Sequence, residues 1–138
     1  MAFDPPERLN IADHFLDARV REGRGDKIAL VCGERRLSYL EVQSLANRFG
    51  SVLLGLGIGP EQRVIIALSD GPEWVGAFFG ILKIGAVVVM VNPQLKPEDI
   101  GYFYEYTRAR AAVVAATCLP AFSEAAQGAR HLDRKSVV

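Results

Sequence analysis

The residue types that most often do chemistry are scarce in this chain, and those present stand alone. The two cysteines, Cys32 and Cys118, belong to no Cys-x-x-Cys or Cys/His cluster, so the sequence shows no zinc site and fits a reducing compartment. His14 and His131 lack a partner at a spacing typical of a metal ligand or a catalytic base. No Walker A loop, nucleophile elbow or HExxH motif occurs. We therefore predict no catalytic residue and no metal site in these 138 residues.

A glycine-rich run, Gly55 to Pro60, has the spacing of a dinucleotide-binding loop but not its setting. Such a loop follows a strand and opens a helix, so that backbone N–H groups at the helix start meet pyrophosphate. Here a predicted helix precedes the run, a predicted strand follows it, and Pro60 has no N–H to donate. The pattern favours the end of a helix followed by a turn.

Aromatic side chains crowd one predicted helix near residue 100. A platform on which nucleic-acid bases stack would carry arginine or lysine between the aromatic residues. The charged neighbours here are acidic instead, so we expect Tyr102 and Tyr106 to cover one helix face while Phe103 packs on the sheet. The aromatic residues are Tyr102, Phe103, Tyr104 and Tyr106, and the acidic ones are Glu98, Asp99 and Glu105.

The composition is that of one ordinary globular domain. The chain has a mass of 15.1 kDa, 50% of its residues are hydrophobic and 23% are charged. Its 16 Lys and Arg residues balance 16 Asp and Glu residues, so no basic field exists to hold nucleic acid.

One apolar stretch, Trp74 to Val91, is long enough to suggest a membrane span and carries only one charge, that of Lys83. It changes at Gly85 from helix-like spacing to a β-branched run, which favours two buried elements over a membrane span. Residues 1–6 lack the basic and apolar regions of a signal peptide. We therefore expect a cytoplasmic protein without a membrane span.

The elements that must position any site begin with a helix and a hairpin in residues 1–37. Asn10 is a helix cap, the apolar face follows it, and residues 21–26 break the helix. Strands at residues 27–31 and 35–37 then form a hairpin around Gly33. The predicted apolar face consists of Ile11, Phe15, Leu16 and Val20.

Residues 38–138 alternate between helices and strands. Ser38 and Glu41 form a capping box, and Gly57 ends the helix that it opens. Apolar strands separated by helices indicate βαβ units, a parallel sheet and helices on both faces. We predict buried strands at 63–68, 86–91 and 111–115, the start of another at 135–138, and helices at 72–84 (capped by Ser69 or Asp70), 98–108 and 120–127.

Ligands of open parallel sheets bind beyond the carboxyl ends of the strands. Those ends are predicted at residues 69–71, 92–94 and 116–118. None of them combines a nucleophile with a base, a pair of metal ligands or a phosphate-binding loop. The residues alone thus predict a single α/β domain over 1–138, incomplete because its last predicted strand is interrupted.

Four segments resemble the N-terminal part of the adenylate-forming enzyme superfamily, which includes acyl- and aryl-CoA synthetases, luciferases and nonribosomal adenylation domains. Their order and spacing match the superfamily over most of the chain. The start of the chain, residues 9–17 and 22–27, is similar to bacterial benzoate-type aryl-CoA ligases. The four segments are Leu37–Val42, Gly57–Val64, Leu82 to Pro93 together with Lys96-Pro97-Glu98, and Ala109–Val114.

The resemblance implies an ATP-dependent ligase that joins a small carboxylate to AMP and then transfers the acyl group to the thiol of CoA. It implies ATP, Mg²⁺ and CoA for the parent enzyme, and the N-terminal part of its large domain as the fold. The family's phosphate loop, acyl-pocket aromatic motif, ribose-binding Asp and C-terminal-domain Lys are absent from these 138 residues. We therefore expect an N-terminal portion that is inactive alone and binds no cofactor tightly.

The same resemblance supplies the only candidate site residues. Some aryl-CoA ligases carry an Arg in an Asn-Pro-Arg-Leu-Lys segment, and that Arg contacts a phosphate of CoA. This chain has Gln94 at that position, beside Lys96. Gln cannot neutralise a phosphate, so the contact is neutral or moves to Lys96, and a solvated loop is the alternative.

A function of another class also stays open. A self-contained, non-catalytic binding or interaction domain derived from the same fold would keep the sheet without the chemistry. Such a domain would need a closed sheet edge and polar cover. An N-terminal portion would instead expose apolar surface and sheet edges where layers are missing, so we expect self-association to be possible.

Overall fold

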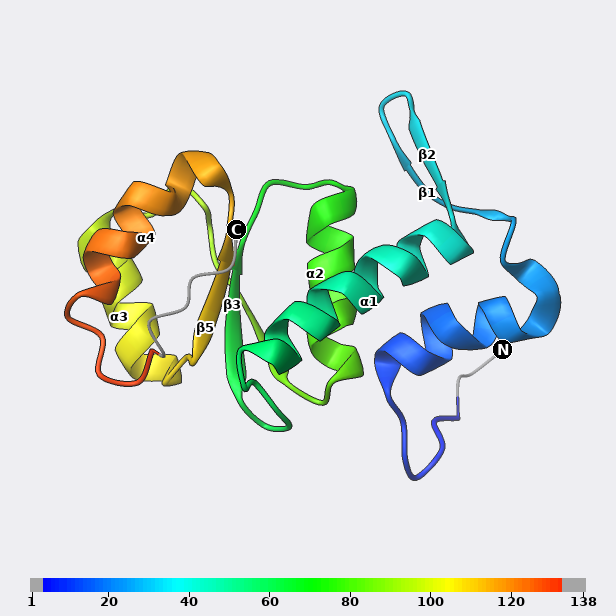
Figure 1. Cartoon of the computed structure of the whole chain (residues 1–138), viewed down its shortest axis with the longest axis horizontal. Helices are drawn as coiled ribbons and strands as arrows, with labels where there is room; N and C mark the ends of the chain where they lie inside the picture. The colour runs from blue at the N-terminus through cyan, green and yellow to red at the C-terminus, as the bar shows by residue number, and fades with distance from the viewer. Residues whose placement is uncertain (1–3, 133–138) are drawn as a thin grey trace.

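The computed structural model describes residues 4–132, and the strand predicted at residues 135–138 lies outside them. A three-stranded sheet stands at the centre with a pair of helices on each face (Figure 1). A two-stranded hairpin and an N-terminal helical segment lie beside one of these helix layers (Figure 1). This arrangement confirms the predicted α/β class with parallel strands and helices on both faces.

The sheet has the order β4-β3-β5, and all of its strands are parallel. The central strand β3 (Arg63–Ala67) lies between β4 (Val87–Met90) and β5 (Ala111–Val114). Strands β3 and β5 are buried as predicted, but β4 is not. Val87 is 38% exposed and Met90 is 59% exposed. The other outer strand, β5, is covered on both faces by the helix layers, whereas β4 is covered only in part.

Alternation along the strands divides the core into two layers. Residues of β3 and β5 that point to one face pack with α1 (Tyr39–Gly55) and α2 (Pro72–Lys83). Residues on the opposite face pack with α3 (Pro97–Thr107) and α4 (Leu119–Ala126), which follows the short 3₁₀ helix η3 (Ala116–Cys118). Both layers are visible on the two sides of the sheet (Figure 1).

The ends of α1 follow their sequence signals. The Ser38 hydroxyl accepts a hydrogen bond from the backbone N–H of Glu41 (3.3 Å), and the Glu41 carboxylate accepts one from the backbone N–H of Ser38 (2.7 Å). At the other end Gly57 has φ 79°, and the N–H of Ile58 returns to the carbonyl of Leu53 at 3.0 Å. The glycine-rich run is therefore a helix end and turn, as predicted.

The start of α2 differs from its prediction. Gly71 occupies the N-cap position, and no side chain caps the helix, so neither Ser69 nor Asp70 has the expected role. Pro72 stands in the first helical turn, where its missing N–H leaves one fewer donor to satisfy. The need for a side-chain cap is correspondingly smaller.

The hairpin forms at the position predicted from the sequence. Strands β1 (Ile28–Cys32) and β2 (Arg35–Ser38) pair antiparallel, and Gly33 at the turn has φ 58°. Backbone hydrogen bonds from Tyr39 to Lys27 (3.0 Å) and from Leu40 to Gly25 (3.0 Å) fix the hairpin to the start of α1.

The N-terminal helical segment begins at Asn10, whose side chain accepts hydrogen bonds from the N–H groups of Ala12 (2.9 Å) and Asp13 (3.3 Å). It continues through the π-helical turns η1 (Asp13–Asp17) and η2 (Val20–Arg24). The predicted break falls at Gly23, which has φ 78°.

The buried face of this segment was predicted incorrectly in part. Leu16 is buried together with Ala12, whereas Ile11 is 43% exposed and Phe15 is 53% exposed. The π-helical turns are wider than the α-helical turns that the predicted spacing assumed, so the apolar positions do not stay on one face.

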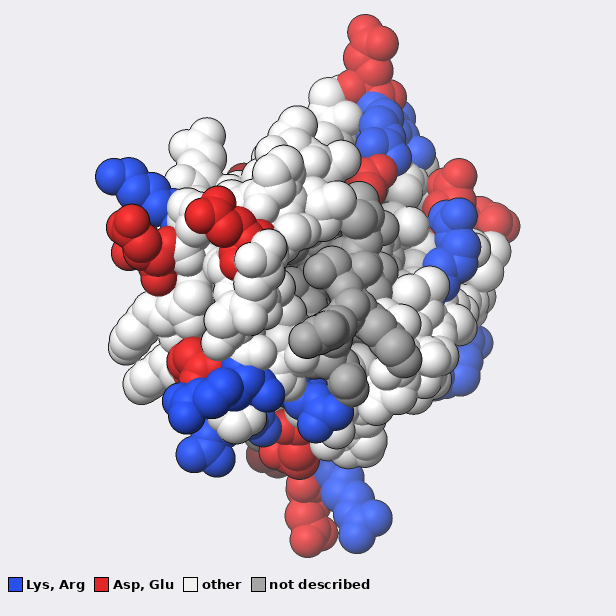
Figure 2. All heavy atoms as spheres, turned by 60° about the vertical axis from the view of Figure 1, so that its left-hand side comes forward, with Lys and Arg blue, Asp and Glu red and all other residues white. Residues whose placement is uncertain are grey.

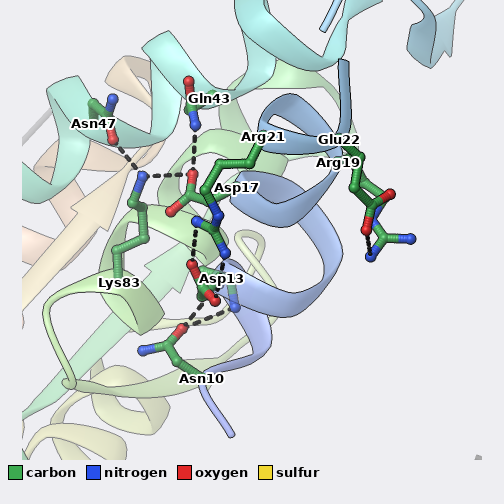
Figure 3. A network of polar contacts seen from close by, with 10 residues as sticks. Asn10, Asp13, Asp17, Arg19, Arg21, Glu22, Gln43, Asn47 and Lys83 are labelled. Atoms are coloured by element: carbon green, nitrogen blue, oxygen red, sulfur yellow. Dashed lines mark hydrogen bonds and ion pairs between the residues drawn. The ribbon is translucent and has the colours of Figure 1, made fainter. Parts of the chain in front are cut away.

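A polar cluster ties this segment to α1 and α2 (Figure 3). The Asp17 carboxylate accepts hydrogen bonds from Lys83 Nζ and from Gln43 Nε2, both at 2.8 Å. Lys83 Nζ also donates to Asn47 Oδ1 at 2.6 Å, and the Asn10 amide donates to a carbonyl at the end of α2 at 2.8 Å. The side chains of Asp17 and Lys83 are only 15% and 22% exposed, so this ion pair is largely shielded from water.

Candidate functional site

The three strands are parallel, so the loops that follow β3, β4 and β5 all lie beyond the same ends of the strands, the carboxyl ends. Residues at this edge come from the segments 68–71, 91–96 and 115–118. A hollow of about 390 Å³ lies between the ends of β3 and β5. Its floor is apolar, from Phe49, Leu68 and Val113, and Ser69, Asp70 and Glu73 supply polar groups. This is the edge at which ligands of such sheets bind.

The loop after β4 carries both candidate CoA-binding residues. The Asn92 side chain accepts a hydrogen bond from the backbone N–H of Gln94 at 2.9 Å, which forms an Asx turn directly after the strand. Two residues later Lys96 occupies the N-cap position of α3, and its side chain does not cap the helix. Gln94 and Lys96 are both exposed. Within residues 4–132 no hydrogen bond or ion pair holds either side chain, so both are available to a ligand.

The residue types considered first for chemistry stay apart in the fold. Cys32 lies in β1, while Cys118 lies in η3 and contributes to the packing around α3 and α4. His14 lies on the N-terminal helical segment with its ring edge-on to Phe15 at 4.8 Å, and His131 is exposed. Among the described residues, 4–132, no three His, Cys, Asp or Glu side chains come together to hold a metal ion.

The aromatic cluster on α3 divides between core and solvent. Phe103 packs toward the sheet, as predicted. Tyr104 is the member that is fully buried, and burial raises its pKa to about 12. Tyr102 and Tyr106 stack on each other at 5.4 Å along one face of α3, as predicted, and they are 60% and 74% exposed.

Charges of both signs are interspersed over the molecule. On the face shown in Figure 2, Lys and Arg side chains lie next to Asp and Glu side chains around the margin, with uncharged residues between these groups. In the part of the chain that the structure describes, no helix is both long and apolar enough to cross a bilayer.

Two polar features of the structure had no signal in the sequence. The Arg35 guanidinium on the hairpin donates to the Glu73 carboxylate on α2 at 3.0 and 3.4 Å, and this hydrogen bonding lowers the pKa of Glu73. The Asp17–Lys83 ion pair joins residues 66 positions apart. Neither pair has the close spacing within one helix that would have revealed it.

The fold is that of an α/β protein in which the loops after the parallel strands gather on the side where ligands of such sheets bind. Residues 16–138 match the family described as AMP-binding enzyme, and the chain belongs to this family. It is 34% identical over 122 residues to a 3-hydroxybenzoate–CoA/4-hydroxybenzoate–CoA ligase of Thauera aromatica. It is 35% identical over 128 residues to a 4-hydroxybenzoate–CoA/benzoate–CoA ligase of Rhodopseudomonas palustris. These matches cover 88% and 93% of this chain.

Solved structures agree with the sequence relatives. The anthranilate CoA ligase AuaEII, determined in complex with anthranoyl-AMP, superposes with a TM-score of 0.88 at 32% identity over 98% of this chain. A benzoate CoA ligase from Burkholderia xenovorans LB400 superposes with a TM-score of 0.80 at 30% identity over 88% of this chain. The chain spans 23% and 24% of the two relatives above, and 26% and 24% of these two solved chains.

Proposed function

We propose that this chain forms the N-terminal part of the large domain of an ATP-dependent aryl-carboxylate–CoA ligase. The observation that carries the proposal is the superposition of 98% of the chain on 26% of an aryl-CoA ligase at a TM-score of 0.88. The benzoate-type relatives favour an aromatic carboxylate as the substrate class.

The proposed reaction has two steps. A carboxylate oxygen attacks the α-phosphorus of ATP, which forms the acyl-adenylate and releases pyrophosphate. The CoA thiol then attacks the acyl carbon, the bond to AMP breaks, and the thiol proton leaves. Mg²⁺ would accompany ATP and screen the charge of its phosphates.

This chain would contribute the loop after β4 to the second step. The Asx turn at Asn92 fixes the backbone from which Gln94 and Lys96 project. Lys96 would place its ammonium group against a phosphate of CoA, and Gln94 would add at most a neutral hydrogen bond. Both side chains fit this role because they are exposed and unpaired within residues 4–132.

A chimera tests this assignment. Residues 1–138 would replace the matching segment of AuaEII, which they cover almost throughout. We expect the chimera to retain ligase activity, Lys96→Gln to raise the KM for CoA about two- to fivefold, and Gln94→Arg to lower it. The rate of adenylate formation, measured as pyrophosphate release without CoA, should stay unchanged in both variants. Lys27→Gln, an exposed lysine on the hairpin side, is the matched control. An unchanged KM for CoA in both loop variants would contradict the assignment.

We also propose that the 138-residue chain has no ligase activity by itself, because the family's phosphate loop and catalytic lysine are absent from it. Pyrophosphate release that depends on both ATP and benzoate, measured on the pure chain, would contradict this. Large exposed apolar side chains, including Val31, Leu54 and Met90, support association with further protein rather than a free-standing interaction domain. A cytoplasmic location stays a proposal that cell fractionation tests.

A further inference from the structure

The loop between β4 and α3 is ordered by two local contacts of one residue. The Asn92 side chain accepts the backbone N–H of Gln94 at 2.9 Å, and the Asn92 carbonyl accepts the N–H of Leu95 at 3.3 Å. The first contact is an Asx turn, and the second closes a β-turn over residues 92–95. Asparagine at the first position and proline at the second, here Pro93, are residue types that favour such a turn.

Both ends of this loop are anchored to the rest of the fold. The N–H of Val91 donates to the carbonyl of Ile66 in β3 at 3.1 Å, which continues the sheet up to the loop. Leu95 is half-buried and packs with the core layer that contains α3 and α4. The Lys96 carbonyl accepts the N–H of Ile100 at 3.0 Å, in the first turn of α3. The turn lies between these anchors and sets the course of the chain from one to the other.

The side chains of Gln94 and Lys96 take no part in these contacts. The loop is held by backbone groups and by the Asn92 side chain, while Gln94 and Lys96 are exposed. Glu98 and Asp99 follow in the first turn of α3, and among the described residues neither forms an ion pair with Lys96. Two side chains thus stay free while the backbone beneath them is fixed.

A fixed backbone matters for a surface contact with a phosphate group. Such a contact adds little affinity when a flexible lysine must first be held in one geometry, because the lost freedom offsets the attraction. A backbone that is ordered before the ligand binds lowers this cost. In the part of the chain that the structure describes, the Asn92 side chain makes one hydrogen bond, so its contribution is the turn itself.

We propose that Asn92 is a positioning residue for CoA, which acts through the loop and not by contact with the ligand. Its amide oxygen holds the N–H of Gln94, and the resulting turn presents Gln94 and Lys96 to the phosphate groups of CoA. This role rests on the proposed function, because it requires that Lys96 contact CoA.

The chimera with AuaEII tests this role through the KM for CoA. We expect Asn92→Ala to raise that KM about two- to threefold, because both side chains remain but lose their fixed backbone. Asn92→Ser should restore most of the loss, since a serine hydroxyl accepts the same N–H in an ST turn. The kcat at saturating CoA should stay unchanged. The double variant Asn92→Ala/Lys96→Gln should have the KM of Lys96→Gln alone, because Asn92 acts through Lys96.

Asn47→Ala is the matched control. Asn47 is an exposed asparagine on α1, and its side chain accepts a hydrogen bond from Lys83 Nζ at 2.6 Å. This variant also loses an asparagine hydrogen bond, yet its KM for CoA should equal that of the unmodified chimera. Thermal unfolding shows whether each variant folds.

Amide hydrogen exchange on the 138-residue chain gives a second measurement, which does not depend on the chimera. The N–H of Gln94 should exchange more slowly in the unmodified chain than in Asn92→Ala, and equal rates would overturn the role of Asn92. The role is also overturned if Lys96→Gln raises the KM for CoA while Asn92→Ala does not, or if the two effects add in the double variant. An unchanged KM in both single variants refutes the CoA contact itself, and the role of Asn92 with it.

Discussion

The contact between α1 and α2 depends on Gly80, and replacing it with alanine should destabilise the protein. A Cβ atom at this position would lie 2.7 Å from the carbonyl oxygen of Ala46, 2.8 Å from Phe49 Cβ and 3.0 Å from the backbone nitrogen of Gly50. Two of these three atoms are backbone, so the helices must move apart to accept the methyl group. Overpacking of this kind costs about 1–3 kcal/mol, and the rigid neighbours place Gly80→Ala near the upper value.

The gain in helix propensity offsets part of this cost. Alanine is favoured over glycine by about 1 kcal/mol in a helix interior, so we expect a net loss of about 2 kcal/mol in the free energy of unfolding. Gly101→Ala in α3 is the matched control, because nothing lies within 4 Å of its added Cβ. The same substitution there should stabilise the protein by about 0.5–1 kcal/mol.

Urea unfolding followed by circular dichroism measures both changes. The expected result is opposite signs for the two variants, with a difference of about 3 kcal/mol. If Gly80→Ala proves as stable as the unmodified chain while Gly101→Ala gains stability, the close approach of α1 and α2 does not limit packing and the reasoning is refuted.

Three further predictions concern charged and titrating groups. Lys83→Met leaves the shielded Asp17 carboxylate without its cation, so the free energy of unfolding should fall by about 1–3 kcal/mol. A double-mutant cycle with Asp17→Asn should show strong coupling between the two positions. Hydrogen bonding to Arg35 lowers the pKa of Glu73 from 4.5, so the stabilisation by this carboxylate is present above pH 4.5 and is lost as the pH falls through the folded-state pKa. Glu73→Gln should therefore flatten the acid side of the plot of unfolding free energy against pH. An unchanged plot would show that the pair contributes nothing. Burial raises the pKa of Tyr104 from 10.0 to about 12, so the contribution of the neutral side chain to folding stability is complete below pH 10.0 and is lost as the pH rises through about 12. Tyr104→Phe should remove the last phase of tyrosine ionisation in an ultraviolet absorbance titration. A last phase that persists in this variant would contradict the burial of Tyr104.

Local signals in the sequence determined most of the elements. The capping box at Ser38 and Glu41 and the glycine at position 57 fix the two ends of α1 through hydrogen bonds between residues close in the chain. Apolar runs with helices between them indicated a parallel sheet, because strands buried on both faces carry no alternating polar residues. The resemblance to adenylate-forming enzymes rests on the same segments, and the family match over residues 16–138 confirms it.

Strand order and side-chain pairing were decided only by the tertiary structure. The run at residues 86–91 has the composition of a buried strand, yet Val87 and Met90 are exposed, since composition does not specify how much of a strand the helix layers cover. The π-helical turns after Asn10 likewise altered a face that α-helical spacing had predicted.

The candidate sites divide in the same way. Gln94 and Lys96 could be named from the sequence because they lie two residues apart on one loop that resembles a known motif. The contact between Arg35 and Glu73 could not, because it joins a hairpin and a helix whose relative position depends on long-range packing. Sequence fixes hydrogen bonds over a few residues, whereas groups from distant segments meet only after the hydrophobic layers have packed and set the distances between them.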